Sequence, residues 1–421
     1  MSKNKALFEF IDASKSAYHT VANVSARLVA EGYTRLYEND RWELSDGGKY
    51  FVVRDGSSII AFRNAKGGFM ICASHGDSPA FRVKQDMKRG AYVKLDVEKY
   101  GGMIHYSWLD RPLSVAGRAV VKTDNGVESR LVALDKRVVI PSLAIHMNRS
   151  VNDGVALAPH TDLVPLASLG EAGALLSLLA DALSVAESDI VSHELYLAGA
   201  DKPTEIGFDG ELMLSPRIDD LACVHASLEA FLSADNRESV PVLAVFNNEE
   251  VGSATKQGAA STFLHNTLKR IAGSENEYYS RLESSFMVSA DNAHASHPNH
   301  PELSDSNNAP ILGGGVVIKH NSNQRYTTDA VSDAIFRKMC EKEDIKLCTY
   351  YNRADQLGGS TLGSIAGTKV SVYSVDVGIP QLAMHSLVET CAISDYYEMV
   401  KALRCCYSSS LKIKGENIVI S

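Results

Sequence analysis

The second half of the chain alternates helical patterns with short strand-like runs, and this alternation constrains the fold more than any other feature. From about residue 210, apolar residues at helical spacing alternate with runs rich in valine and isoleucine. Such alternation is typical of an α/β fold with a mostly parallel sheet flanked by helices, because parallel strands need a crossover between them. The expected helices span 221–234, 328–343 and 394–413, and the expected strands span 240–246, 284–291, 314–320 and 369–378.

The N-terminal segment extends this pattern. Residues 6–36 carry apolar side chains at helical spacing and reach Gly32, a common helix terminator, which predicts one or two amphipathic helices. Strand-like runs follow at 50–55, 58–63 and 68–74.

Residues 86–205 differ in texture, because β-like runs repeat there around a single helical stretch at 171–185. Asn125 and Gly126 predict a hairpin turn, since both central positions of a type I′ turn need positive φ. We therefore expect a mainly-β domain over 86–205, inserted into an α/β domain made of residues 1–85 and 206–421.

The composition is that of an ordinary globular protein, with 45% hydrophobic and 22% charged residues. A formal charge of −9 gives no electrostatic footprint for nucleic acid, so we expect no such partner. The seven cysteines form no C-x-x-C pair, which argues against both a disulfide framework and a thiolate zinc site. No apolar run suits a signal peptide or a membrane span, so we expect a cytoplasmic protein without a membrane partner.

Histidine and acidic side chains follow several of the expected strands. In open α/β sheets, ligands gather beyond the carboxyl ends of the strands. A set of histidines and carboxylates without cysteine suits divalent ions such as Zn²⁺ or Mn²⁺. The residues that follow strands are His75, Asp77, Glu249, Glu250, Asp291, His294 and His385, and Asp219 stands just before an expected helix.

Each of these residues also has a structural interpretation. A lone histidine at a strand end is more often hydrogen-bonded than metal-bound. Glu249 and Glu250 could be a solvated acidic pair, although two carboxylates at the edge of a sheet invite a cation. Asp77 could accept the second ring N–H of His75 and fix its tautomer, as metal-bound histidines usually require.

Seven motifs follow one another along the chain: "ASHGDSPAFRVK", "SPRIDDL", "NNEEVGS", "VSADNAHASHPN", "VIKHNSNQRY", "DQLGGSTLGSI" and "PQLAMHS". Together and in this order they resemble the aspartyl aminopeptidases, a branch of the dinuclear-zinc exopeptidases. The resemblance runs through nearly the whole chain, and implies a zinc exopeptidase-like catalytic domain with an inserted dimerisation domain.

The resemblance implies two Zn²⁺ ions per subunit, with Mn²⁺ or Co²⁺ as possible replacements. Asp219 would bridge the two ions, Glu249 would be the general base, and Asp77 would orient a ligand histidine. The remaining ligands would be His75 and Asp291 at one ion, and Glu250 and His385 at the other.

The resemblance also implies substrate contacts from His294, Lys319 and Tyr326, with Lys319 facing an acidic N-terminal residue of a peptide. His146 would reach the active site of a neighbouring subunit, which implies dimers assembled into a tetrahedral dodecamer. Taken alone, Lys319 would be a solvated surface lysine, Tyr326 a half-buried aromatic residue and His294 a surface histidine.

Three positions depart from the family pattern without removing a ligand. Gly76 replaces a threonine, Asp220 replaces an asparagine and adds a negative charge, and Gly358 stands where a cysteine is common. The leading hypothesis is a metalloaminopeptidase that removes N-terminal aspartate or glutamate. The alternatives are a dinuclear enzyme for neutral residues or another amide, and a non-catalytic assembly protein with the same fold.

Overall fold

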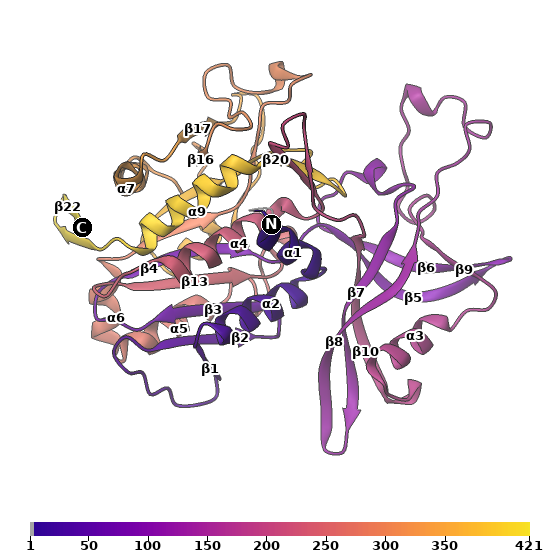
Figure 1. Cartoon of the computed structure of the whole chain (residues 1–421), viewed down its shortest axis with the longest axis horizontal. Helices are drawn as coiled ribbons and strands as arrows, with labels where there is room; N and C mark the ends of the chain where they lie inside the picture. Colours follow the sequence, from indigo (N-terminus) through magenta and orange to yellow (C-terminus); the bar gives the residue numbers. More distant parts are fainter. Residues whose placement is uncertain (1–3) are drawn as a thin grey trace.

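The computed structural model describes residues 4–421, so residues 1–3 of the predicted segment 1–85 lie outside it. The larger part of the molecule is built on a nine-stranded sheet with helices on both faces (Figure 1). In sheet order the strands are β1 (Thr34–Leu36), β2 (Lys49–Arg54), β3 (Ser58–Arg63), β13 (Val240–Phe246), β4 (Phe69–His75), β14 (Phe286–Ala290), β18 (Tyr373–Gly378), β16 (Val316–His320) and β17 (Leu347–Tyr351).

The sheet is mixed, with most of its neighbouring strands parallel. The central strands β13, β4, β14 and β18 run parallel to one another, whereas β3 pairs antiparallel with both of its neighbours and β16 pairs antiparallel with β18. The predicted α/β class is therefore confirmed, and the parallel character is concentrated at the centre of the sheet.

Alternating side chains of the central strands feed two apolar layers. In β4, Met70 and Cys72 belong to one hydrophobic cluster, whereas Phe69 and Ile71 belong to the other, as the two-residue period of a strand requires. The first layer packs against α1 (Lys5–Ala13), α2 (Ala17–Ala30), α4 (Ile218–Ser233), α7 (Ala330–Cys340) and α9 (Ile393–Tyr407), and the second against α5 (Phe263–Ala272), α6 (Glu275–Leu282) and α8 (Leu362–Gly367).

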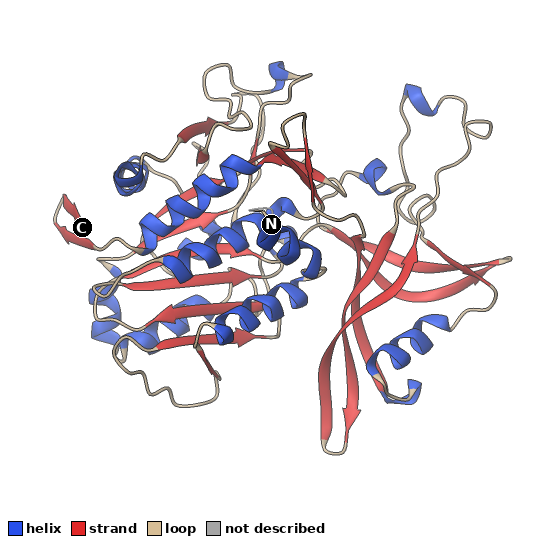
Figure 2. Cartoon of the chain, in the orientation of Figure 1, coloured by secondary structure: helices blue, strands red, loops and turns tan. Residues whose placement is uncertain are grey.

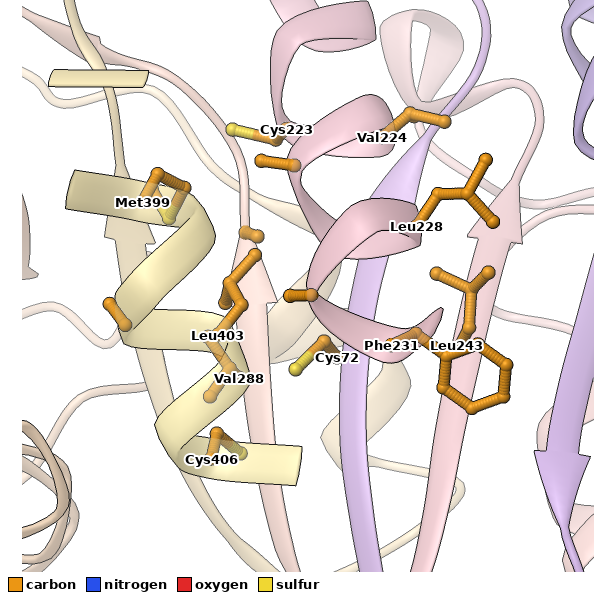
Figure 3. Packing of buried hydrophobic residues seen from close by; sticks show 14 of the residues in the cluster. Cys72, Cys223, Val224, Leu228, Phe231, Leu243, Val288, Met399, Leu403 and Cys406 are labelled. Atoms are coloured by element: carbon orange, nitrogen blue, oxygen red, sulfur yellow. The ribbon is translucent and has the colours of Figure 1, made fainter. Parts of the chain in front are cut away.

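The helices α4 and α9 pack side by side on the sheet. Figure 3 shows Leu228 and Phe231 of α4 beside Leu243, with Leu403 of α9 beside Val288. Each such buried side chain contributes about 1.5–3 kcal/mol of hydrophobic stabilisation. This packing holds the start of α4 at a fixed position relative to the central strands.

A second sheet, entirely antiparallel, lies beside the first (Figure 2). It has its own apolar core, which includes Phe81, Trp108 and Leu195. We propose that residues 86–205 form the inserted domain, with β5 starting a few residues before its first boundary. The strands are β8 (Gly126–Val138), β7 (Leu113–Thr123), β10 (Ile190–Gly199), β5 (Ala80–Arg89), β6 (Tyr92–Tyr100) and β9 (Leu166–Leu169), and its helix is α3 (Ala174–Leu183).

The predicted hairpin between β7 and β8 is present, but its turn lies one residue earlier than expected. Thr123 pairs with Gly126, so the two central residues are Asp124 and Asn125. Neither Asn125 nor Gly126 is among the residues with positive φ in the described chain. The predicted type I′ turn is therefore wrong, because Gly126 serves as the first residue of β8.

A small five-stranded sheet is formed by short strands from segments that connect the larger elements. Its strands are β11 (Thr204–Ile206), β12 (Leu212–Ser215), β20 (Glu389–Ala392), β19 (Pro380–Leu382) and β15 (Ala293–His294). A separate hairpin near the end of the sequence consists of β21 (Leu411–Lys414) and β22 (Asn417–Ile420).

Within residues 4–421, no helix is both long and apolar enough to cross a membrane.

Candidate active site

Three neighbouring parallel strands end at the same edge of the large sheet and carry candidate residues there. His75 is the last residue of β4, Asp291 directly follows β14, and Glu249 and Glu250 follow β13 in a short 3-10 turn. Asp219 does not follow one of these strands but lies in the first turn of α4. Because parallel neighbours place their carboxyl ends together, these side chains meet in one place.

Asp219 lies between two histidines. Its Oδ1 atom is 3.4 Å from Nε2 of His75, and its Oδ2 atom is 3.7 Å from Nε2 of His385. The same nitrogen of His385 is 3.5 Å from Oε1 of Glu250. Each oxygen of the Asp219 carboxylate therefore faces a different histidine, which is the arrangement of a carboxylate that bridges two ions.

These separations fit metal coordination. Two ligand atoms about 2.0–2.1 Å from a tetrahedral zinc ion lie about 3.3–3.4 Å apart. Oδ1 of Asp219 and Oε1 of Glu250 are also buried without a hydrogen-bond partner in the described chain, and a cation would satisfy both. His75, Asp219 and Asp291 can direct one atom each to a common point, as can His75, Glu249 and Glu250.

The carboxyl groups of the cluster hold protons more tightly than in water. Burial raises the pKa of Glu249 to about 8 and the pKa of Asp291 to about 6. Burial, followed by the neighbouring Asp219 carboxylate, also raises the pKa of Glu250 well above its ordinary value. Such crowding of anionic groups favours either protonation or a bound cation.

Asp77 contacts several residues of the cluster through its backbone oxygen and its carboxylate. Nδ1 of His75 is 3.1 Å from the backbone oxygen of Asp77 and 3.6 Å from its Oδ1. The Asp77 carboxylate accepts the backbone N–H groups of Glu249 and Glu250, each at 3.2 Å, and the hydroxyl of Tyr100 at 2.6 Å. Asp77 therefore contacts both the histidine that it was predicted to orient and the backbone of the glutamate pair.

Glu389 is a central residue that the sequence did not reveal. Its side chain is 2% exposed, and its two oxygens accept the backbone N–H of Asp219 at 3.0 Å and of His385 at 2.7 Å. It therefore ties together two segments that are far apart in the sequence. A glutamate inside an ordinary β-strand pattern carries no signal of this role.

A cleft of about 630 Å³ opens above the cluster. His294, Lys319 and Tyr326 line it together with the predicted metal ligands and Glu249. Gly359 and Thr361 of the motif "DQLGGSTLGSI" also line the cleft. The role of each of these residues stays a prediction.

Lys319 is buried rather than solvated, with only 3% of its surface exposed. Its Nζ donates to the backbone oxygens of Asp291 at 2.8 Å and Asn292 at 3.1 Å, and lies 5.2 Å from the centre of the Tyr326 ring. Burial opposes the charge, but the Asp291 carboxylate and its neighbours raise the pKa of Lys319 above its ordinary value. The cleft thus contains one buried cation beside its carboxylates.

His146 lies outside this cleft. It is exposed, in the long loop between β8 and β9, among exposed apolar residues that include Leu143 and Met147. Figure 1 shows this loop on the side of the molecule that carries the second sheet. A contribution of His146 to a cleft would therefore come from another subunit, as the resemblance implies.

The three departures from the family pattern have distinct surroundings. A Cβ atom at Gly76 would lie 3.2 Å from Thr20, and one at Gly358 would lie only 2.5 Å from Oδ1 of Asn352. Asp220 is fully buried and accepts the backbone N–H of His75 at 3.2 Å. Burial raises the pKa of Asp220 well above its ordinary value, which favours the neutral form.

Comparison with known proteins gives a family from the sequence and solved structures with the same fold. A family model described as aminopeptidase I zinc metalloprotease (M18) matches residues 10–407. A probable M18 family aminopeptidase 2 from Clostridium novyi (strain NT) is 40% identical over 418 residues, which covers 94% of this chain and 96% of the relative.

The solved structures agree. Ape4 in its cryo-EM complex with Nbr1 matches with a TM-score of 0.92 and 35% identity, covering 96% of this chain and 85% of that chain. The mApe1 dodecamer of S. cerevisiae matches with a TM-score of 0.83 and 23% identity over 95% of each chain, a likeness that shows the fold alone. These findings confirm the predicted zinc peptidase family and a hydrolase activity. The chain therefore belongs to the M18 family of zinc metalloaminopeptidases.

Proposed function

We propose that this enzyme removes N-terminal aspartate or glutamate from peptides and uses two zinc ions held on either side of Asp219. The observation that carries this proposal is the division of the Asp219 carboxylate between His75 and His385 at 3.4 and 3.7 Å. His75 and Asp291 would hold one ion, while Glu250 and His385 would hold the other.

The protein groups around the ions would divide the remaining work. When bound, the zinc ions supply Lewis acidity toward the scissile carbonyl and toward water. Glu249 would take a proton from the attacking water and later give it to the leaving amine. Asp77 fixes the backbone of Glu249 and thus the position of its side chain.

The acidic preference would come from Lys319. An ammonium group has three N–H donors, and the carbonyls of Asp291 and Asn292 take two, which leaves one for a substrate carboxylate. The same two hydrogen bonds favour a second candidate function, an aminopeptidase with neutral specificity in which Lys319 is purely structural.

One set of rate measurements separates these functions. We expect the purified enzyme to hydrolyse an aspartyl substrate faster than a leucyl substrate, and to lose both activities on chelation. Glu249→Ala should lower kcat by about 10²–10⁴-fold with zinc still bound, since general base catalysis is worth that much. Faster leucyl hydrolysis would support the neutral specificity, and Lys319→Met should abolish any aspartyl preference without removing leucyl hydrolysis.

We further propose that subunits pair through the second sheet and its loops and assemble into a tetrahedral dodecamer. The dodecameric mApe1 structure of the same fold and the exposed apolar loop around His146 support this assembly. Light scattering would measure the mass of the assembly, and His146→Ala should lower activity without changing that mass.

A cytoplasmic location is also proposed, because all seven cysteines are free.

A further inference from the structure

Tyr100, the last residue of β6 in the second sheet, contacts Asp77, the residue that holds the glutamate pair of the cluster. The Tyr100 hydroxyl donates to Oδ2 of Asp77 at 2.6 Å and accepts from Nδ2 of Asn248 at 2.9 Å. Its ring packs edge-on against Tyr196 of β10, with ring centres 5.4 Å apart, so both ends of the side chain are held. Burial, followed by the Asp77 carboxylate, raises the pKa of Tyr100, which keeps the hydroxyl protonated as a donor.

The residues that follow Tyr100 contact the other side of the cluster. A Cβ atom at Gly101 would lie 3.1 Å from Cβ of Glu250, so the backbone there approaches a predicted ligand closely. The N–H of Ile104 donates to the backbone oxygen of His385 at 3.0 Å. Ser107 accepts the N–H of Leu387, two residues beyond that histidine, at 2.9 Å.

We propose that Tyr100 is a positioning residue that the second sheet supplies to the catalytic cluster, acting through Asp77. The proposal rests on the proposed function of that cluster. Asp77 has two carboxylate oxygens for several donors, and Tyr100 fixes the rotation of the group so that the backbone N–H groups of Glu249 and Glu250 keep their acceptors. The glutamate pair then holds its place relative to His75.

This arrangement makes the second sheet part of the active site rather than a separate assembly module. A shift of β6 relative to the large sheet would move Tyr100 away from Asp77 and release the segment that holds His385. Contacts made by the second sheet with another subunit would therefore be transmitted to the metal ligands through residues 100–107.

The test compares Tyr100→Phe with Tyr92→Phe in the full-length, zinc-loaded enzyme. Both tyrosines lie on β6, but Tyr92 is exposed, so its replacement controls for the chemical change itself. Zinc affinity is measured by chelator competition, and kcat and KM are measured at saturating zinc. We expect Tyr100→Phe to lower zinc affinity or kcat by about 10- to 100-fold, the usual cost of losing an outer-sphere partner, while KM stays unchanged.

The outcome is decisive in either direction. Zinc affinity and kcat that both stay within about threefold of the Tyr92→Phe enzyme would overturn the proposal, because a positioning contact costs more than that. If the enzyme cleaves no peptide, the proposed function fails, but the zinc affinities still test Tyr100. If Tyr100→Phe does not fold, Tyr196→Leu tests the same contact, because it removes the ring that packs against Tyr100; zinc affinity and kcat within about threefold of the Tyr92→Phe enzyme would then overturn the proposal.

Discussion

Replacing Glu389 with glutamine tests how the two central ligand segments are held. In the native protein, one carboxyl oxygen accepts the N–H of Asp219 and the other accepts the N–H of His385. Glutamine has nearly the same shape but a single acceptor oxygen. In either orientation of the amide, one of the two buried N–H groups must face an NH₂ group.

The expected cost follows from that single lost acceptor. An unsatisfied buried donor costs about 1–3 kcal/mol, and we take about 2 kcal/mol for this site. Because Asp219 and His385 are both predicted ligands, the loss should appear mainly as weaker zinc binding. A cost of about 2 kcal/mol corresponds to a roughly 30-fold rise in the zinc dissociation constant.

Zinc titration calorimetry measures this constant directly, and the zinc-dependent rise in melting temperature measures it independently. Glu398→Gln is a matched control, because Glu398 also accepts a backbone N–H, that of Lys346 at 3.0 Å, but Lys346 is not a predicted ligand. Wild-type zinc affinity in Glu389→Gln, with only a lower melting temperature of the metal-free protein, would refute the reasoning.

Three further predictions concern the metal, the contact between the two sheets and pH. Chelation should abolish hydrolysis and lower the melting temperature, because the Asp219 and Glu250 carboxylates then repel each other, and added zinc should restore both; full activity of the chelated enzyme would contradict this. Arg118→Met should lower the free energy of unfolding by about 2 kcal/mol, because the partly buried Arg118 on β7 joins Asp55, between β2 and β3 of the large sheet, at 3.2 Å and Glu194 of the second sheet at 2.7 Å; an unchanged urea midpoint would argue otherwise. Burial raises the pKa of Asp395 from 3.8 to about 6, so the folded state binds its proton more tightly and stability falls as pH rises between these values. Between these pH values, the free energy of unfolding should therefore fall less in Asp395→Asn than in the wild type. Parallel curves of unfolding free energy against pH for the two proteins would rule this out.

The sequence located most of the candidate ligands because they follow recognisable strands, whereas Asp219 stands at the start of a helix. His75 ends a run of buried residues, Asp291 directly follows β14, and Glu249 follows β13 after Asn247 and Asn248. An apolar strand followed by a polar residue is a local pattern, so it can be read without knowing the contacts. The resemblance then assigned each residue a distinct role, which local patterns alone do not supply.

Other features could not be predicted in this way. Tyr100 and Glu389 sit in ordinary strands, with Tyr100 23 residues away from Asp77 in sequence and Glu389 170 residues away from Asp219. The burial of Lys319 was likewise invisible, because its neighbours in sequence do not tell whether the end of β16 faces solvent or a cleft. The hairpin turn was misplaced because pairing of Thr123 with Gly126 decided which residues stand at its tip.

The sequence by itself determined the α/β class, the second β-rich region, the family and the identity of the residues that follow the strands. Only the tertiary structure decided that Asp219 faces two histidines with its two oxygens, and that the second sheet supports the cluster through Tyr100. The physical reason is the separation along the sequence over which each kind of interaction acts. Periodicity and turn chemistry act over a few residues, whereas the distances within the site depend on how distant strands, helices and a second sheet pack together.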